Sequence, residues 1–120
     1  MILIVDRDSS FRKFLYTLFK NGGGFDSCVE ARNGVEAIAK TKKLLPSLAI
    51  LDSAMPEMSG LQLVRKLKGI MPELPIFMMT SENDMDIERE ALSCGITAVF
   101  SKLDDMASLV ANARAVCGIE

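Results

Sequence analysis

The chain has 120 residues, 49% of them hydrophobic, which is enough for one compact domain with a buried core and too few for two. The formal net charge is -2, from 14 basic and 16 acidic side chains, so the chain lacks the strongly positive balance of proteins that bind nucleic acid directly. No apolar run approaches the roughly 20 residues of a membrane-spanning helix. The first residues show no basic segment or cleavage site of a secretory signal, so we expect a cytoplasmic protein without membrane contact.

Histidine is absent, and the cysteines are scattered as Cys28, Cys94 and Cys117. Without histidine the chain cannot form a Ser-His or Cys-His catalytic pair, and it lacks the commonest ligand of transition metals. The cysteines form no C-x-x-C pair, so we expect reduced thiols rather than a disulfide framework or a zinc site. Carboxylates, hydroxyls and lysines are left to carry any chemistry.

Short apolar runs alternate with helical patterns along the chain. The apolar runs of four or five residues are typical of strands buried on both faces, and the segments with apolar residues three or four apart are typical of amphipathic helices. In chain order, the pattern predicts a strand at 1–5, a helix at 10–20, a strand at 25–31, a helix at 34–45, a strand at 48–51, a helix at 60–68, a strand at 75–79, a helix from a cap at 83 or 84 to about 94, a strand at 97–101 and a helix opened by 104–105. Asp8 or Ser9 is suited to cap the first helix.

Five strand–helix units joined by short connections predict an α/β fold, with a parallel sheet covered by helices on both faces. The sequence shows no linker, internal repeat or low-complexity segment, and it ends soon after the fifth predicted helix. We therefore expect a single domain over residues 1–120, with no effector domain.

Polar side chains follow four of the five predicted strands. They are Asp6 and Asp8, then Asp52, then Thr80 and Ser81, and finally Lys102. The carboxyl ends of parallel strands share the sheet edge at which open α/β proteins bind ligands, so these side chains can converge. Taken alone, Asp52 fits a metal ligand, a nucleophile or a helix cap. Together with a second acid, a hydroxyl and a lysine, it favours magnesium bound through oxygen and an aspartyl phosphate.

The order and spacing of these residues resemble the receiver domain of two-component response regulators over almost the whole chain. The matching pieces are Ile2-Leu3-Ile4-Val5-Asp6, Arg12, the A-R-N-G-V-E-A run from Ala31 to Ala37, Leu51-Asp52 with Met55-Pro56 and Ser59-Gly60, Thr80-Ser81, Gly95 and Lys102. The resemblance implies a flavodoxin-like (βα)5 fold, a doubly wound parallel sheet of five strands in the order 2-1-3-4-5.

The resemblance also implies a role for each strand-end residue. Asp52 would be the phosphoacceptor, and magnesium would be held by Asp6, Asp52 and the backbone carbonyl of Ala54, with Asp8 as a further candidate ligand. Thr80, Ser81 and Lys102 would contact the phosphoryl group or take part in the switch. The donor would be a histidine kinase or a phosphotransfer protein. The fourth helix, fifth strand and fifth helix would then bind an effector domain or protein, or form a homodimer. Such a chain is a phosphoacceptor with at most slow autodephosphorylation, not an enzyme.

Three positions modify this expectation. Arg7 stands where the family usually has a second acid, and arginine cannot ligate a cation, so we expect weakened magnesium affinity. Three alternatives are open: Asp8 reaches the metal in its place, Arg7 pairs with Asp52 instead of the metal, or Arg7 points to solvent. Val99 stands where the family has its switch aromatic, and alternation sends the adjacent Phe100 to the opposite face of the strand. Glu82 either screens the site from water or is solvated.

Two other functions compete with this interpretation. One is a phosphorylation-independent pseudo-receiver, an interaction module that Arg7 locks in one state. The other is a phosphatase of the haloacid-dehalogenase type, in which Asp6 would be the nucleophile, Asp8 the acid, and Thr80 and Lys102 the phosphate ligands. The phosphatase interpretation leaves Asp52 and the Met-Pro pair after it unexplained.

Overall fold

The computed structural model describes residues 1–22, 24–55, 57–81, 85–102 and 106–119. Strands and helices alternate without exception through these ranges. In chain order they are β1 (Ile2–Val5), α1 (Ser9–Gly22), β2 (Cys28–Ala31), α2 (Gly34–Leu44), β3 (Leu48–Asp52), α3 (Gly60–Ile70), β4 (Ile76–Thr80), α4 (Met85–Ser93), β5 (Ala98–Ser101) and α5 (Met106–Val116). The alternation predicted from the sequence is confirmed. The caps predicted at 83–84 and 104–105 lie outside the described residues.

The strands form one parallel sheet in the order β2-β1-β3-β4-β5, as the resemblance implied. Every residue of β1, β3 and β4 is buried, which explains why these strands are continuous apolar runs. The second strand is shorter than predicted and begins at Cys28, because its neighbouring strand β1 begins at Ile2, which pairs with Cys28. Phe25 lies before the strand and packs its ring edge-on against Phe19, with the centroids 5.5 Å apart.

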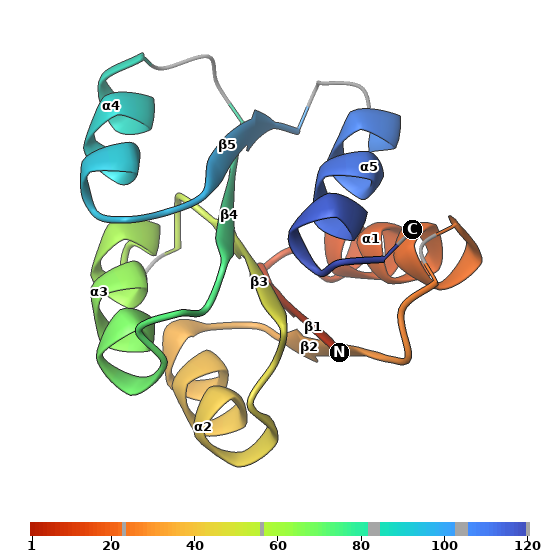
Figure 1. The fold of residues 1–120 in the computed structure, drawn as a ribbon. Helices are drawn as coiled ribbons and strands as arrows, with labels where there is room; N and C mark the ends of the chain where they lie inside the picture. The colour runs from red at the N-terminus through yellow and green to blue at the C-terminus, as the bar shows by residue number, and fades with distance from the viewer. Residues whose placement is uncertain (23, 56, 82–84, 103–105, 120) are drawn as a thin grey trace.

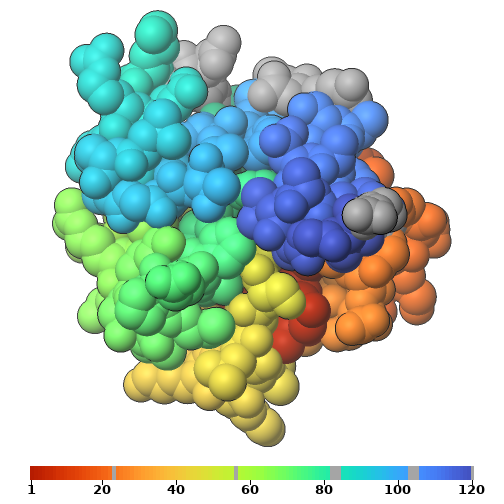
Figure 2. Space-filling view, in the orientation of Figure 1, coloured from red at the N-terminus to blue at the C-terminus, as the bar shows by residue number. Residues whose placement is uncertain are grey.

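Helices cover both faces of the sheet, with α1 and α5 on one side and α2, α3 and α4 on the other (Figure 1). In the space-filling view from the same side, the green and cyan surface of the segments with α3 and α4 lies on the left, and the blue surface of the segment with α5 lies on the right (Figure 2). Each face has its own core. Ile4, Ile50 and Phe77 pack towards α1 and α5, whereas their neighbours Val5, Leu51 and Met78 pack towards α2, α3 and α4. This alternation decides on which side each strand-end residue emerges.

Two local features hold helix starts close to the sheet edge. Ser59 caps α3 in a reciprocal capping box with Gln62. The next residue, Gly60, donates its N–H to the Ser53 carbonyl at 3.1 Å. A Cβ atom on Gly60 would lie only 2.7 Å from the Asp52 carbonyl oxygen, so only glycine allows α3 to begin directly against the end of β3. Among the described residues, the helices are too short or too polar to cross a membrane.

Candidate functional site

Two buried carboxylates lie side by side at the carboxyl edge of the sheet. Asp6 follows the last residue of β1, and Asp52 is the last residue of the neighbouring β3. Asp6 is 2% exposed and Asp52 5% exposed. Both continue the alternation that points towards α1 and α5, so the fold places two negative charges together where little water reaches them.

The ammonium group of Lys102 compensates this pair. Its Nζ lies 2.6 Å from Oδ2 of Asp6 and 3.7 Å from Oδ1 of Asp52. Lys102 comes from the end of β5, two strands away from β3, and its backbone N–H donates to the Thr80 carbonyl at 2.7 Å. The long side chain therefore crosses the end of β4 to reach the carboxylates. Its single ammonium group forms ion pairs with both Asp6 and Asp52.

The pKa of Asp52 is raised above its ordinary value of 3.8. Burial is the largest cause, and the negative charge of Asp6 adds to it. Lys102 and the N–H of Ala54, which lies 3.3 Å from Asp52 Oδ1, act in the opposite direction. The raised pKa means that an added positive charge near Asp52 would be favoured.

Asp6 is fixed from its own loop and from α1. The backbone N–H of Asp8 donates to Asp6 Oδ1 at 2.9 Å, and the Arg12 guanidinium donates to the Asp6 carbonyl at 2.5 Å. Arg12 also pairs with Glu30 on β2 at 3.1 Å. The sequence matched Arg12 to a family pattern but gave it no role; in the structure it ties the end of β1 to β2.

Asp8 is turned away from the carboxylate pair. It is exposed, and its Oδ1 accepts the backbone N–H groups of Ser10 at 2.9 Å and Phe11 at 3.4 Å. These are the contacts of a helix N-cap, and α1 begins at the next residue. The capping role predicted for this segment is therefore the one that the Asp8 side chain takes in the structure.

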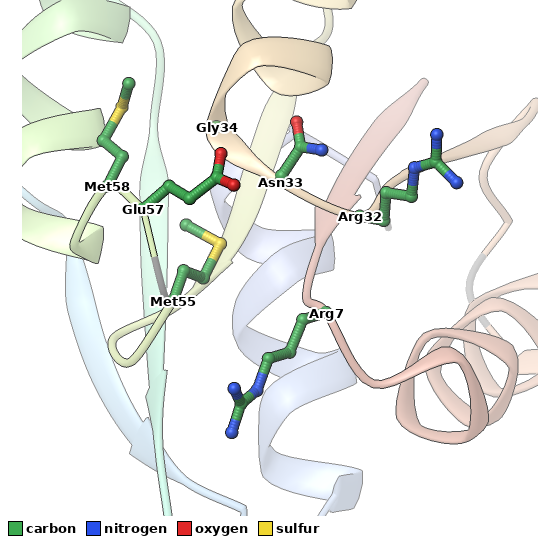
Figure 3. A pocket seen from close by; sticks show the side chains of 7 residues that line it. All are labelled: Arg7, Arg32, Asn33, Gly34, Met55, Glu57 and Met58. Carbon is green, nitrogen blue, oxygen red and sulfur yellow. The ribbon is translucent and has the colours of Figure 1, made fainter.

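Arg7 is exposed and does not pair with Asp52. Among the described residues, no carboxylate forms an ion pair with it. Its side chain lines a pocket of about 230 Å³ together with residues of the β2–α2 and β3–α3 loops, such as Asn33 and Met55. Figure 3 shows the Arg7 guanidinium pointing away from Arg32 and Asn33. Lys102, rather than Arg7, provides the positive charge at the carboxylates.

Thr80 and Ser81 lie on the other side of the sheet edge. Thr80 is buried and follows Met78 in the alternation that points towards α4, whereas Ser81 is exposed. Both line a pocket of about 240 Å³. The other lining residues are Ser53 and Ala54, which follow Asp52 in the chain, and Ile87 of α4. A group bound at Asp52 can therefore be approached from the α1 side by Lys102 and from the α4 side by Thr80.

Val99 and Phe100 face opposite sides of β5, as alternation predicts. Val99 is partly buried against the core under α4, whereas Phe100 belongs to the other core and lies 5.1 Å from Phe77 between ring centroids. Within the described part of the chain, no aromatic ring therefore replaces Val99 on the face that Thr80 occupies. Glu82 lies outside the described residues.

The sequence model of the response regulator receiver domain matches residues 2–114. The chain belongs to this family. The chain is similar to the chemotaxis protein CheY of Bacillus subtilis, with 32% identity over 94 residues that cover 78% of each protein. It is also 36% identical, over 90% of its length, to protein-glutamate methylesterase/protein-glutamine glutaminase 3 of Rhodospirillum rubrum.

Solved structures agree with this assignment. CheY4 of Vibrio cholerae matches 96% of each chain with 26% identity and a TM-score of 0.86. The chain spans only part of several longer relatives, namely 29% of the methylesterase, 20% of the regulatory protein AtoC of Escherichia coli and 55% of a protein of Pseudomonas aeruginosa that is 32% identical to it. The chain is thus a receiver domain of two-component response regulators, and receiver domains occur within longer regulatory proteins.

The receiver site can be tested for its fit to magnesium. Magnesium in proteins needs one or two carboxylates and keeps several waters, and this site offers the buried carboxylates of Asp6 and Asp52 next to each other. Among the described residues, no group of three or more acidic, cysteine or histidine side chains is arranged to hold a metal. The two carboxylates therefore fit a magnesium ion that keeps several waters.

One residue at the receiver site was missed from the sequence. The ring centroid of Phe11, in the first turn of α1, lies 4.4 Å from the Lys102 ammonium nitrogen. In the sequence, Phe11 is only one member of the apolar face of a helix. No local pattern links it to a lysine that follows the last strand.

Proposed function

We propose that this receiver domain accepts a phosphoryl group on Asp52 from the phosphohistidine of a histidine kinase or a phosphotransfer protein. The observation that carries the proposal is the convergence of Asp6 and Lys102 on Asp52, three residues from three different strand ends. The two buried carboxylates share one ammonium group. A negatively charged phosphoryl group therefore fits this site when a further cation binds with it. The setting we propose is the cytoplasm, with signalling rather than catalysis as the role.

The transfer is a single displacement at phosphorus. An Asp52 carboxylate oxygen forms a bond to the phosphorus atom while the bond from phosphorus to the histidine nitrogen of the donor breaks, and the electron pair of that bond stays on the imidazole. The product is an acyl phosphate on Asp52. The Lys102 ammonium would follow the new charge onto a phosphoryl oxygen, and the Thr80 hydroxyl would donate to another.

Magnesium is the proposed cofactor, held by Asp6, Asp52 and the Ala54 carbonyl. When bound, it would neutralise the charge that accumulates on the phosphoryl oxygens. The exposed Asp8 carboxylate caps α1, so Asp8 could join the metal only by giving up that cap. The positive charge of Arg7, next in sequence to Asp6, would lower magnesium affinity relative to receivers that carry an acid there.

The proposed output is a shift between two arrangements of the surface formed by α4, β5 and α5. Phosphorylation would stabilise the minor arrangement through contacts of Thr80, the last residue of β4, and of Lys102, which directly follows β5. On α4, Met85 is 72% exposed and Leu92 48% exposed, and both line a pocket of about 240 Å³. This surface would bind an effector domain or protein, or a second copy of the chain, and we propose no direct contact with nucleic acid or membrane.

Incubation with acetyl phosphate and magnesium tests the proposal. The intact mass should rise by one phosphoryl group, the label should map to Asp52, and the Asp52→Asn variant should stay unlabelled. A stable acyl phosphate on Asp6 would instead support the phosphatase alternative. Absence of labelling in the presence of saturating donor and magnesium would overturn the proposal.

A second candidate function is a phosphorylation-independent pseudo-receiver. Arg7 at the usual acid position favours it, and the Lys102 ammonium already compensates part of the negative charge of Asp6 and Asp52 without a metal. Such a protein would bind its partner with the same affinity before and after incubation with acetyl phosphate. Magnesium-dependent labelling of the unmodified protein at Asp52 with high yield would exclude it.

A further inference from the structure

We propose that Phe11 is a positioning residue, whose ring holds the Lys102 ammonium group against the two buried carboxylates. The inference deepens the proposed function, because it concerns the lysine that would contact the phosphoryl group. Its structural part does not depend on phosphorylation and can be tested without it.

The contacts of the ammonium group carry the inference. Asp6 Oδ2 lies 2.6 Å from Nζ, Asp52 Oδ1 lies 3.7 Å away, and the Phe11 ring centroid lies at 4.4 Å. The Lys102 side chain is only 19% exposed. A cation within about 6 Å of an aromatic centroid is attracted by the negative face of the ring. The Lys102 ammonium group therefore contacts the Phe11 ring as well as the two carboxylates.

The start of α1 fixes the position of the ring. The backbone N–H of Phe11 donates to the Asp8 carboxylate that caps the helix, and the ring packs against Phe14 with 6.0 Å between centroids. The same short loop carries Asp6, so Phe11 and Asp6 are set relative to each other by local backbone geometry. Lys102 arrives from 96 positions away on a flexible four-carbon stem, and it is the group that needs to be held.

Removal of the ring would release the ammonium group without removing its charge. In the Phe11→Leu variant, an apolar side chain remains in the core, but the attraction to the ring face is lost and water gains access to Nζ. The ammonium group would then spend less time near Asp52. We expect phosphorylation by acetyl phosphate to slow about 3- to 10-fold, which is the range that a partly buried cation–π contact supports.

Nuclear magnetic resonance of the unphosphorylated protein provides the structural test. The Lys102 ε-methylene protons should be shifted upfield by the ring current of Phe11. In Phe11→Leu this shift should disappear and relaxation should show a more mobile Lys102 side chain, whereas Phe11→Tyr, which keeps the ring face, should preserve both properties. Tyr16→Leu is the matched control, because Tyr16 lies on the same helix and its ring centroid lies 5.6 Å from the ammonium nitrogen of a different lysine, Lys20.

The outcomes separate this inference from the proposed function. An unchanged Lys102 shift or mobility in Phe11→Leu would overturn the inference, as would an equal loss of phosphorylation rate in Phe11→Leu and Tyr16→Leu. Retention of rate in Phe11→Tyr with loss in Phe11→Leu would support it. If the wild-type protein cannot be phosphorylated, the proposed function fails, and the chemical shift and mobility still decide whether Phe11 positions Lys102.

Discussion

Lys102 Nζ lies 2.6 Å from Asp6 Oδ2, and this contact joins the first and last strand ends of the chain. Both side chains are largely buried, with 19% and 3% of their surfaces exposed. The same ammonium group is the only partner cation of Asp52 among the described residues. The stability of the sheet edge therefore depends on a single positive charge.

Substitution of this cation should destabilise the fold in a pH-dependent way. We expect Lys102→Met to lower the free energy of unfolding by about 1–3 kcal/mol near neutral pH, because buried Asp6 loses its charged hydrogen-bond donor and Asp52 loses its ion-pair partner. The loss should shrink as the carboxyl groups become protonated in acid. Urea unfolding at neutral pH and at a pH below the ordinary Asp value of 3.8 measures the difference. Equal losses at both pH values would contradict the charge-pair explanation.

Neutralisation of Asp52 should have the opposite effect. Because burial and Asp6 raise the Asp52 pKa, the folded protein binds more protons at this site than the unfolded chain. The contribution of Asp52 to the free energy of unfolding is thus fully present below the Asp52 pKa of the unfolded chain. It is lost as pH rises through the Asp52 pKa of the folded protein. We expect Asp52→Asn to melt at a higher temperature than wild type near neutral pH, with the advantage disappearing in acid. Calorimetry over this pH range checks the sign, and a lower melting temperature at neutral pH would contradict it.

Arg7 should control magnesium affinity through its charge and through the missing acid. We expect Arg7→Asp to bind magnesium at least tenfold more tightly than wild type, as measured by titration calorimetry. Arg7→Gln is the control, because it removes the positive charge without adding a ligand, and it should give an intermediate affinity. If both variants bind as wild type does, the exposed Arg7 has no influence on the metal.

Asp8 offers a choice between a helix cap and a metal ligand. The cap predicts that Asp8→Ala lowers the free energy of unfolding by about 1 kcal/mol, whereas Asp8→Asn keeps most of it, because the amide oxygen can still accept N–H groups. In both variants, magnesium affinity should be nearly the same as in the wild-type protein. A loss of affinity in Asp8→Asn with full stability would instead identify Asp8 as a ligand.

Gly60 should tolerate no side chain. A Cβ atom there would lie 2.7 Å from the Asp52 carbonyl oxygen and 2.9 Å from the Ser53 Cα, both of which are backbone atoms. We expect Gly60→Ala to lower the free energy of unfolding by about 1–3 kcal/mol and to slow phosphorylation, because β3 or α3 must move. Gly69→Ala is a matched control on the same helix, where a Cβ atom would meet nothing within 4 Å, and it should be neutral or stabilising.

The sequence by itself determined the order of the elements and the identity of the strand-end residues. Run length and helical spacing are local properties, so the alternation of strands and helices followed from them, and parallel strands must end at one edge. The start of β2 could not be predicted from its own residues, because it depends on where the neighbouring β1 begins. The expected direction of Val99 and Phe100 was correct, because alternation along a strand is also local.

Only the tertiary structure decided which contacts the side chains at that edge make. The sequence left open whether Asp8 was a cap or a ligand and whether Arg7 met Asp52, and it gave no sign of Phe11 beside Lys102. These relations depend on strand register, on the angle at which α1 leaves β1 and on the reach of one lysine across β4. Such relations are set by the packing of residues up to 96 positions apart, which no local pattern of amino acids encodes.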